Sequence, residues 1–259
     1  MRRLALAATA VVLAAPAAAG AADRTVERAH VTVSVEPNGI LHVTDRRLLH
    51  APAPYTAAVD VSMRQGELFA EPAVTVGGRR FHAGDSRAAA TFLVSKETTG
   101  IRIAWRQPAG THEASVSYRL ALCGVAYEDV VDLPVVLWSG GSLPRLDASV
   151  VLPRSPRGPV YAWLDPKSTT ATVATGGRQI RVRARGLTGS LALRLAFPRA
   201  VLSSTAGTVV HPGAGLAHIV ADESRPPTNR KWTAIVAGIS VGAALVAVAL
   251  LYRSRRRNS

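Results

Sequence analysis

The sequence predicts a mainly β protein with two consecutive β-sandwich domains, an N-terminal signal peptide before them and one C-terminal transmembrane helix after them. Three observations support this fold class. Residues 23–231 show apolar–polar alternation with a period of two far more than helical periodicity, turn residues separate the alternating runs, and uncharged apolar segments lie near both chain ends. The chain has 259 residues, of which 48% are hydrophobic and 19% charged. This is enough for one large or two ordinary domains.

Residues 1–22 are typical of a secretory signal peptide. Arg2 and Arg3 precede an apolar stretch over residues 4–15, and small residues follow as far as Ala22. A charged start, a short apolar run and alanine-rich cleavage positions define such a peptide. We therefore expect export, which places the domains that follow outside the cytoplasm.

The first predicted domain, residues 23–123, opens with a β-hairpin. Valines alternate with polar residues over residues 31–35, and the loop that follows contains proline, asparagine and Gly39. Such a loop is a good hairpin signal, because glycine adopts the positive φ that the turn needs. A three-residue loop predicts two cross-strand pairs on one buried face, Val35 with Leu41 and Val33 with Val43.

Further strands are predicted at the spacing of a sandwich. In the first domain they lie near residues 57–62, 73–76, 80–82, 90–94, 101–105 and 113–122. After a connection over residues 124–144, the second and smaller domain spans residues 145–202, with strands near 146–152, 160–164, 170–174, 179–184 and 191–197. So many strands would make a single sheet unwieldy, and two packed sandwiches are expected.

The C-terminal part of the chain is predicted to anchor the protein in a membrane. Residues 203–231 lose the alternation and are rich in Gly, Pro, Ser and charged residues, as in a flexible stalk. Residues 232–252 carry no charge, and as a helix they would be roughly 31 Å long, close to the ~30 Å hydrocarbon thickness of a bilayer. The basic tail, residues 253–259, then predicts a single-pass type I protein of the bacterial cell membrane with its ectodomain outside.

Gly238 and Gly242 form a G-x-x-x-G pattern within the predicted membrane helix. Small residues at this spacing allow two helix backbones to approach closely in lipid. The pattern predicts a homodimer through this helix face, although alanine- and glycine-rich helices also contain it by chance.

Four stretches of the sequence occur in an order that a known family shares. They are Val31-Thr-Val-Ser-Val-Glu-Pro-Asn-Gly39 with Leu41-His-Val-Thr44, Ile101-Arg-Ile103 with Gly110-Thr-His112 and Val116-Ser-Tyr-Arg119, Tyr127-Glu-Asp129 with Leu133 and Leu137-Trp138, and Val150-Val-Leu-Pro153. Together, over residues 26–200, they resemble the YciQ-like family of bacterial predicted membrane proteins, whose extracytoplasmic part is a domain of unknown function of the DUF2207 type. The chain departs from the family pattern at Asn38, at Asp45 and in its single C-terminal apolar segment. The resemblance implies no established chemistry.

Seven histidines raise the alternative of an exported copper-handling protein. The strand around His30 is loosely similar to the entry of YcnI-type copper proteins, which makes His30 the candidate metal ligand. In the predicted hairpin register, His42 lies opposite Ser34 and His30 opposite Arg46, so roughly 13 Å separate the two imidazoles. We therefore expect no metal and no other cofactor, and keep copper binding by ectodomain histidines as the alternative function.

Arginines alternate along one predicted strand of the second domain. Arg181, Arg183 and Arg185 project from one of its faces, and Arg194 on the next strand is expected beside Arg181. Such a stripe predicts screened attraction to anionic lipid head groups or anionic wall polymers. A solvated sandwich face, on which arginine also discourages edge-to-edge pairing, is the alternative.

Other conspicuous residues are expected to be structural. Glu128, Asp129 and Asp132 lack the ligand spacing of a calcium loop and are expected to cap the interdomain turn. Trp138 is expected in core or interdomain packing. The single cysteine, Cys123, excludes an intramolecular disulfide and is expected to be a buried small hydrophobe.

The sequence contains no catalytic motif, phosphate-binding loop or dinucleotide fingerprint. The net charge of +14 divides into +2 in residues 1–22, +4 in residues 253–259 and +8 in between. Nearly half of the basicity therefore belongs to the predicted topology signals, and export makes nucleic acid a poor partner. We expect a binding or assembly module of a cell-envelope membrane protein, not an enzyme, with an unidentified envelope protein among its partners.

Overall fold

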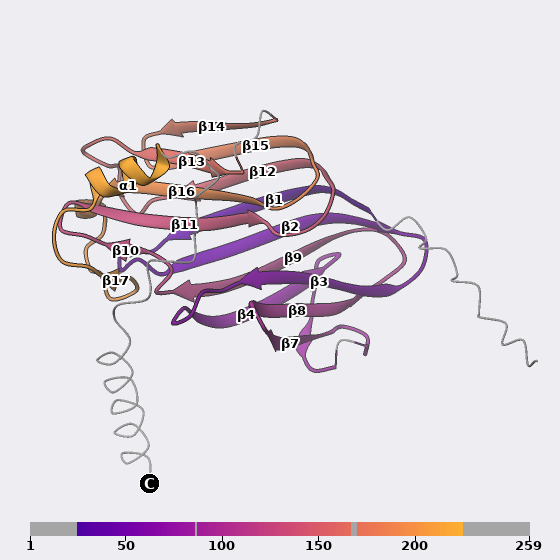
Figure 1. Cartoon of the computed structure of the whole chain (residues 1–259). Helices are drawn as coiled ribbons and strands as arrows, with labels where there is room; N and C mark the ends of the chain where they lie inside the picture. Colours follow the sequence, from indigo (N-terminus) through magenta and orange to yellow (C-terminus); the bar gives the residue numbers. More distant parts are fainter. Residues whose placement is uncertain (1–24, 86, 167–169, 225–259) are drawn as a thin grey trace, which may run out of the picture.

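The computed structural model describes residues 25–85, 87–166 and 170–224, which fold predominantly into β-strands (Figure 1). This confirms the predicted mainly β class. The predicted signal peptide, transmembrane helix and basic tail lie outside the described residues. Within the described part of the chain, no helix combines the length and apolar character that a membrane crossing requires.

An eight-stranded sheet forms the base of the molecule, and one of its faces is buried under two smaller sheets. In spatial order its strands are β14 (Ala171–Gly176), β15 (Gln179–Leu187), β12 (Leu143–Val151), β1 (Thr25–Val35), β2 (Leu41–Ala51), β9 (Gly110–Ala121), β4 (Leu68–Val76) and β5 (Arg79–Arg80).

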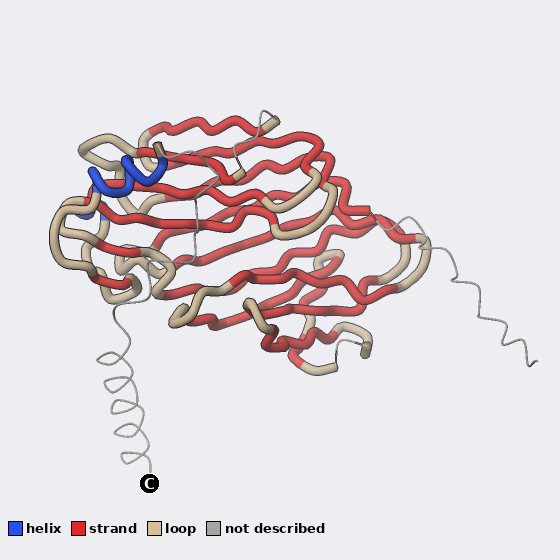
Figure 2. Tube along the Cα trace, in the orientation of Figure 1, coloured by secondary structure: helices blue, strands red, loops and turns tan. Residues whose placement is uncertain are grey.

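Two smaller sheets cover the buried face. The five-stranded sheet contains, in order, β13 (Tyr161–Asp165), β16 (Leu191–Pro198), β11 (Val130–Trp138), β10 (Val125–Ala126) and β17 (Val209–Val210). The four-stranded sheet contains β3 (Tyr55–Ser62), β8 (Gly100–Gln107), β7 (Thr91–Glu97) and β6 (His82–Ala83). Figure 2 shows how little of the described chain is helical: a short 3₁₀ turn, η1 (Arg199–Val201), and one α-helix, α1 (Leu216–Glu223).

The alternating sequence pattern accounts for the buried face. Successive side chains of a strand point to opposite sides of a sheet, and alternate residues of β1, β2, β9 and β15 are buried along most of each strand. The predicted hairpin is confirmed: Val35 pairs with Leu41 and Val33 with Val43, and all four side chains are buried. Gly39 has a φ of 87° in the turn between the two strands.

The parallel pairing of β1 with β12 joins strands from both predicted domains into one sheet. Val31 lies opposite Ala148 and Val33 opposite Val150. The buried residues of all three sheets form one large hydrophobic cluster, and a small satellite around Tyr127 and Ile219 lies under α1. The base sheet and the core are thus continuous across the expected boundary.

Two segments that the sequence assigns to connections are folded. Residues 124–144 include β10 and β11, and β17 and α1 lie in residues 203–224, at the start of the expected stalk. β17 pairs with β10, and Ile219 of α1 is fully buried in the satellite cluster. The expected stalk is rich in Gly, Pro, Ser and charged residues, but a few apolar residues in its folded part pack onto the five-stranded sheet.

Candidate ligand-binding cleft

A cleft of about 440 Å³ opens between the two smaller sheets, above the base sheet. Its walls are residues 59–64, from β3 onward, and residues 134–139, from β11 onward. β3 is the edge strand of the four-stranded sheet. β10 pairs only with residues 131 and 132 of β11, so the rest of β11 has no strand neighbour on that side among the described residues. The cleft therefore lies between two open strand edges.

Polar contacts lie at both ends of the cleft, one between its two walls and one between a wall and the base sheet. At one end, the Ser139 hydroxyl donates a hydrogen bond to the Asp60 carbonyl at 2.8 Å. At the other end, the Arg64 guanidinium donates to the carbonyl of Cys123, which follows β9. These two contacts mark the ends of the cleft.

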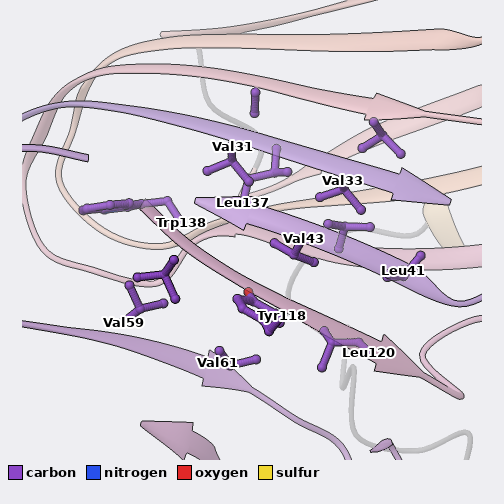
Figure 3. Close-up of a cluster of buried hydrophobic side chains, with 14 of the residues drawn as sticks. Val31, Val33, Leu41, Val43, Val59, Val61, Tyr118, Leu120, Leu137 and Trp138 are labelled. Atoms are coloured by element: carbon purple, nitrogen blue, oxygen red, sulfur yellow. The ribbon is translucent and has the colours of Figure 1, made fainter. Parts of the chain in front are cut away.

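Most of the lining is apolar. Figure 3 shows side chains from β1, β2, β3, β9 and β11 converging on this region. The apolar residues that line the cleft include Val31, Leu41, Val43, Val59, Val61, Leu120, Val135, Leu137 and Trp138. Its volume lies within the range of about 300–1,000 Å³ that small-molecule pockets occupy, and such pockets are mostly apolar with a few placed polar groups.

The first polar group is a buried ion pair on the floor of the cleft. Asp45 and Arg47 occupy inward positions of β2, and they are 6% and 7% exposed. Nε of Arg47 lies 3.1 and 3.0 Å from the two carboxylate oxygens, and Nη2 lies 2.7 Å from Oδ2. The Arg47 guanidinium also stacks 4.5 Å from the ring centroid of Trp138. A forked, stacked geometry of this kind suits arginine and would not suit lysine.

The second polar group is the hydroxyl of Tyr118. Tyr118 lies on β9 opposite Val43, one inward position away from Asp45, and is 7% exposed. No hydrogen-bond partner of its hydroxyl is found in the part of the chain that the structure describes. Burial raises the pKa of Tyr118 well above its ordinary value, and the negative charge of Asp45 raises it further. The phenol is therefore neutral at physiological pH, with its donor unused.

A third polar group, made up of Arg64, Glu67 and Cys123, lies at one end of the cleft. Nε of Arg64 pairs with the Glu67 carboxylate at 2.6 Å. Cys123 is buried as expected, and burial, followed by the charge of Glu67, raises the pKa of its thiol to about 12. At neutral pH this sulfur is a protonated thiol, not a thiolate nucleophile.

The arginine stripe is exposed only in part. Arg181, Arg183 and Arg185 project from the outer face of β15 as predicted. Arg194 was expected beside Arg181, and this is wrong: Arg194 lies on β16 in the five-stranded sheet and is 5% exposed. The neighbours of Arg181 are Ser149 and Ala174. β16 is apolar on both faces, so apolar–polar alternation in the sequence does not show where its single arginine points. Its ion pairs hold Arg194 in a buried position.

Arg194 holds a buried ion-pair cluster together. It contacts both carboxylate oxygens of Asp132, at 2.9 and 2.7 Å, and its Nη1 contacts Asp222 at 2.8 Å and Glu223 at 3.0 Å. Because Asp222 and Glu223 belong to α1, the cluster clamps this helix to the five-stranded sheet.

The acidic residues before β11 have structural contacts. The Asp129 carboxylate accepts hydrogen bonds from the backbone N–H groups of Gly215 and Leu216 at the start of α1. The Gly215 bond is the main cause that lowers the pKa of Asp129. Glu128 accepts from the Gly213 N–H at 3.1 Å. These carboxylates hold the segment that leads into α1, whereas capping of an interdomain turn was expected.

The histidines do not form a metal site in the structure. His30 lies opposite Arg46 and His42 opposite Ser34, in the predicted register. Within residues 25–85, 87–166 and 170–224, no three His, Cys, Asp or Glu side chains gather around a possible metal position. The copper alternative therefore has no support. Gly238 and Gly242 lie outside the described residues, so dimerisation through them stays a prediction.

The group of Asp45, Arg47 and Tyr118 was not predicted from the sequence, although one signal for it was present. Along residues 41–51 the inward positions read Leu, Val, Asp, Arg, Leu and Ala. Two opposite charges on an otherwise apolar face indicate a buried pair, because an isolated charge there would be costly. The nearby Tyr118 hydroxyl had no such signal.

Several solved structures are distantly similar to the chain. A putative nutrient binding protein of Legionella pneumophila is 13% identical, with 66% of each chain covered and a TM-score of 0.43. A putative protease of Parabacteroides distasonis is 9% identical, with 66% of this chain and 39% of that chain covered and a TM-score of 0.36. An M1 zinc metallopeptidase of Deinococcus radiodurans is 12% identical, with 66% and 42% covered and a TM-score of 0.32. The chain spans less than two thirds of each of these proteins, and scores this low carry no argument about function.

Comparison with curated proteins finds no match. Comparison with protein-family models matches residues 25–197 to the N-terminal domain of a predicted membrane protein family, DUF2207. The match covers most of the described strands and more than half of the chain. The narrower YciQ-like relationship stays a prediction. The chain belongs to the DUF2207 family of predicted membrane proteins.

Proposed function

We propose that residues 25–224 are the extracytoplasmic binding module of a single-pass protein of the bacterial cell envelope, and that the cleft holds a small, mostly apolar ligand. The observation that carries the proposal is the cleft itself, with apolar walls, a buried ion pair and the unused Tyr118 hydroxyl on its floor. Family membership supports a membrane protein, and the signal and anchor segments predicted from the sequence support the topology. A binding role without catalysis fits a cleft whose cysteine is a protonated thiol.

The proposal is tested by blocking the cleft at its rim. Val136 lines the cleft and is 43% exposed, so a tryptophan there can narrow the opening without entering the core. Leu93 on β7 is 45% exposed and does not line the cleft, which makes Leu93→Trp a matched control. The full chain is placed in lipid nanodiscs without detergent, and binding of the apolar fluorophore N-phenyl-1-naphthylamine is measured against empty nanodiscs.

We expect saturable fluorescence enhancement in the wild type and in Leu93→Trp, and at least a tenfold loss of affinity in Val136→Trp. Equal binding by all three chains, or no binding above that of empty nanodiscs, would contradict the proposal.

A second candidate function is attachment to anionic surfaces through the outer face of β15. The stripe of Arg181, Arg183 and Arg185 is exposed, and Arg145 on β12 lies directly opposite Arg185. Asp147 partly neutralises the stripe, since it contacts Arg145 at 2.7 Å and Arg183 at 3.6 Å. Remaining positive charge attracts anionic surfaces in a salt-dependent manner.

This candidate predicts salt-sensitive co-flotation of the nanodisc-embedded chain with phosphatidylglycerol liposomes. Replacing Arg181, Arg183 and Arg185 together with serine removes the attraction while leaving the cleft unchanged. Undiminished co-flotation of this variant would exclude the stripe as the attachment surface.

A further inference from the structure

We infer that the cleft selects a neutral amphiphile with one linear apolar chain, whose terminal hydroxyl bonds to Tyr118 and Asp45. The inference rests on the proposed function and names the ligand class. Three properties of the lining lead to it: its charge, its hydrogen-bonding groups and its shape.

The charge of the lining disfavours an anionic ligand. Arg47 and Arg64 are its basic residues, and four acidic residues, Asp45, Asp60, Glu67 and Asp165, also line the cleft. The fork of Arg47 is already occupied by Asp45, so it does not offer a carboxylate a bidentate partner. An anionic head group on the floor would lie beside Asp45 without a counter-charge of its own, and a buried unpaired charge is costly.

The same pairing reduces the attraction for a cation. Three of the four acidic residues have an arginine partner: Arg47 pairs with Asp45, Arg64 with Glu67 and Arg102 with Asp60. The fourth, Asp165, is half-buried on β13. On the floor itself, the charges of Asp45 and Arg47 neutralise each other, so a neutral head group fits the floor best.

The hydrogen-bonding groups on the floor call for a hydroxyl. Tyr118 has an unused donor, and Asp45 has spare acceptor capacity, because its Oδ1 receives only the Arg47 Nε–H. Tyr118 lies opposite Val43, two residues before Asp45, and such diagonal neighbours on adjacent strands are within reach of aromatic side chains. A hydroxyl accepts one hydrogen bond and donates another, so it bonds to both groups at once. A carbonyl would bond only to Tyr118.

The shape of the cleft fits a linear chain. Each wall follows six consecutive residues, 59–64 on one side and 134–139 on the other. At about 3.3 Å per residue, the five steps along each wall give a groove roughly 17 Å long. Valine, leucine and tryptophan side chains line it, so a chain of methylene groups is buried along its length without any polar group to satisfy.

The inference is tested with ligands that share a ten-carbon chain and differ in the head group. Each of 1-decanol, decanoate, decylamine and 1-chlorodecane is titrated against N-phenyl-1-naphthylamine bound to the full chain in nanodiscs, with empty nanodiscs as the blank, and the displacement of the probe is measured. We expect decanol to displace the probe at concentrations at least tenfold lower than decanoate or decylamine.

Tyr118→Phe removes the hydroxyl and keeps the ring. Loss of one buried hydrogen bond predicts about tenfold weaker decanol binding and unchanged chlorodecane binding. The control is Tyr127→Phe, at a tyrosine of equal exposure that does not line the cleft.

The outcomes separate this inference from the proposed function. If the probe binds in the cleft but decanoate or decylamine competes as well as decanol, the hydroxyl assignment falls and the binding module stands. If Tyr118→Phe binds decanol as tightly as the wild type does, the hydroxyl assignment also falls and the binding module stands. If Val136→Trp does not weaken probe binding, the proposed function itself falls. The head-group series uses the wild type, so it decides the question even if Tyr118→Phe fails to fold.

Discussion

The thiol of Cys123 is held in its protonated form by its position at the end of the cleft. Burial raises its pKa to about 12, from an ordinary value of 9.0, and Glu67 adds to the effect. The residue is 4% exposed. Both properties slow alkylation, because the thiolate is the reactive species and reagents have little access.

We therefore predict that iodoacetamide does not label Cys123 in the folded protein at pH 8 and labels it fully in concentrated urea, as mass spectrometry would show. Rapid labelling under native conditions would contradict the burial of this residue.

The raised thiol pKa also predicts a pH dependence of stability. Well below pH 9 the thiol is protonated in both the folded and the unfolded state, so it contributes almost no pH dependence there. Between pH 9 and about 12 the unfolded chain loses this proton and the folded chain keeps it, so the free energy of unfolding falls as the pH rises. We therefore expect the urea midpoint of the wild type to fall between pH 8 and pH 10 by more than the midpoint of Cys123→Ala falls over the same pH range. An identical decrease in both proteins would assign the effect to other groups.

At the scale of elements, α1 is attached to the five-stranded sheet by charge more than by apolar area. Ile219 is its fully buried apolar residue, whereas Asp222 and Glu223 both contact Arg194. Asp132 and Glu223 are 6% and 4% exposed, so removing Arg194 leaves two carboxylates buried without their main counter-charge. The cost of breaking a buried pair in this way is about 3–5 kcal/mol.

Arg194→Met is therefore predicted to lower the free energy of unfolding by about 3–5 kcal/mol and to increase amide hydrogen exchange throughout α1. Arg181→Met, on the exposed face of β15, should change stability by less than about 0.5 kcal/mol. Denaturant unfolding with both variants gives the comparison, and equal stability of the two would show that the cluster does not hold α1.

Sequence patterns predicted individual elements better than the contacts between them. The β1–β2 hairpin was predicted with its register, because its pattern and its turn are local. The location of Arg194 was not, since β16 is buried on both faces and its partners Asp132 and Asp222 are distant in sequence. The cleft was also not predictable, because it is a gap between strands of different sheets. Only the opposite charges of Asp45 and Arg47 on an apolar face indicated that something polar lay inside.

At the scale of the whole molecule, the continuous base sheet has consequences for unfolding. Leu146 on β12 is fully buried, opposite Ala29 of β1 and Ala184 of β15. Its side chain therefore lies at the seam between the two halves, and the hydrophobic cluster extends across this seam. We expect the halves to unfold together.

Leu146→Ala is predicted to cost about 2–5 kcal/mol and to destabilise both halves equally. Single-tryptophan variants that retain Trp105 in β8 or Trp163 in β13 follow the two halves separately. Their urea transitions should coincide in the parent chain and move together after Leu146→Ala. A shift of the Trp163 transition alone would mean that the halves are independent domains.

The pairing of β1 with β12 also determines the order in which the fold is completed as the chain is synthesised. β1 and β2 are both available for pairing once residue 51 has emerged, but the other edge of β1 has no partner until Leu143–Val151 follows. During that interval, Val31 and Val33 border an open strand edge, which is a template for pairing with other chains. A chain that stops before β12 would keep this edge permanently, so truncations that end before Leu143 should aggregate and not yield a soluble first half.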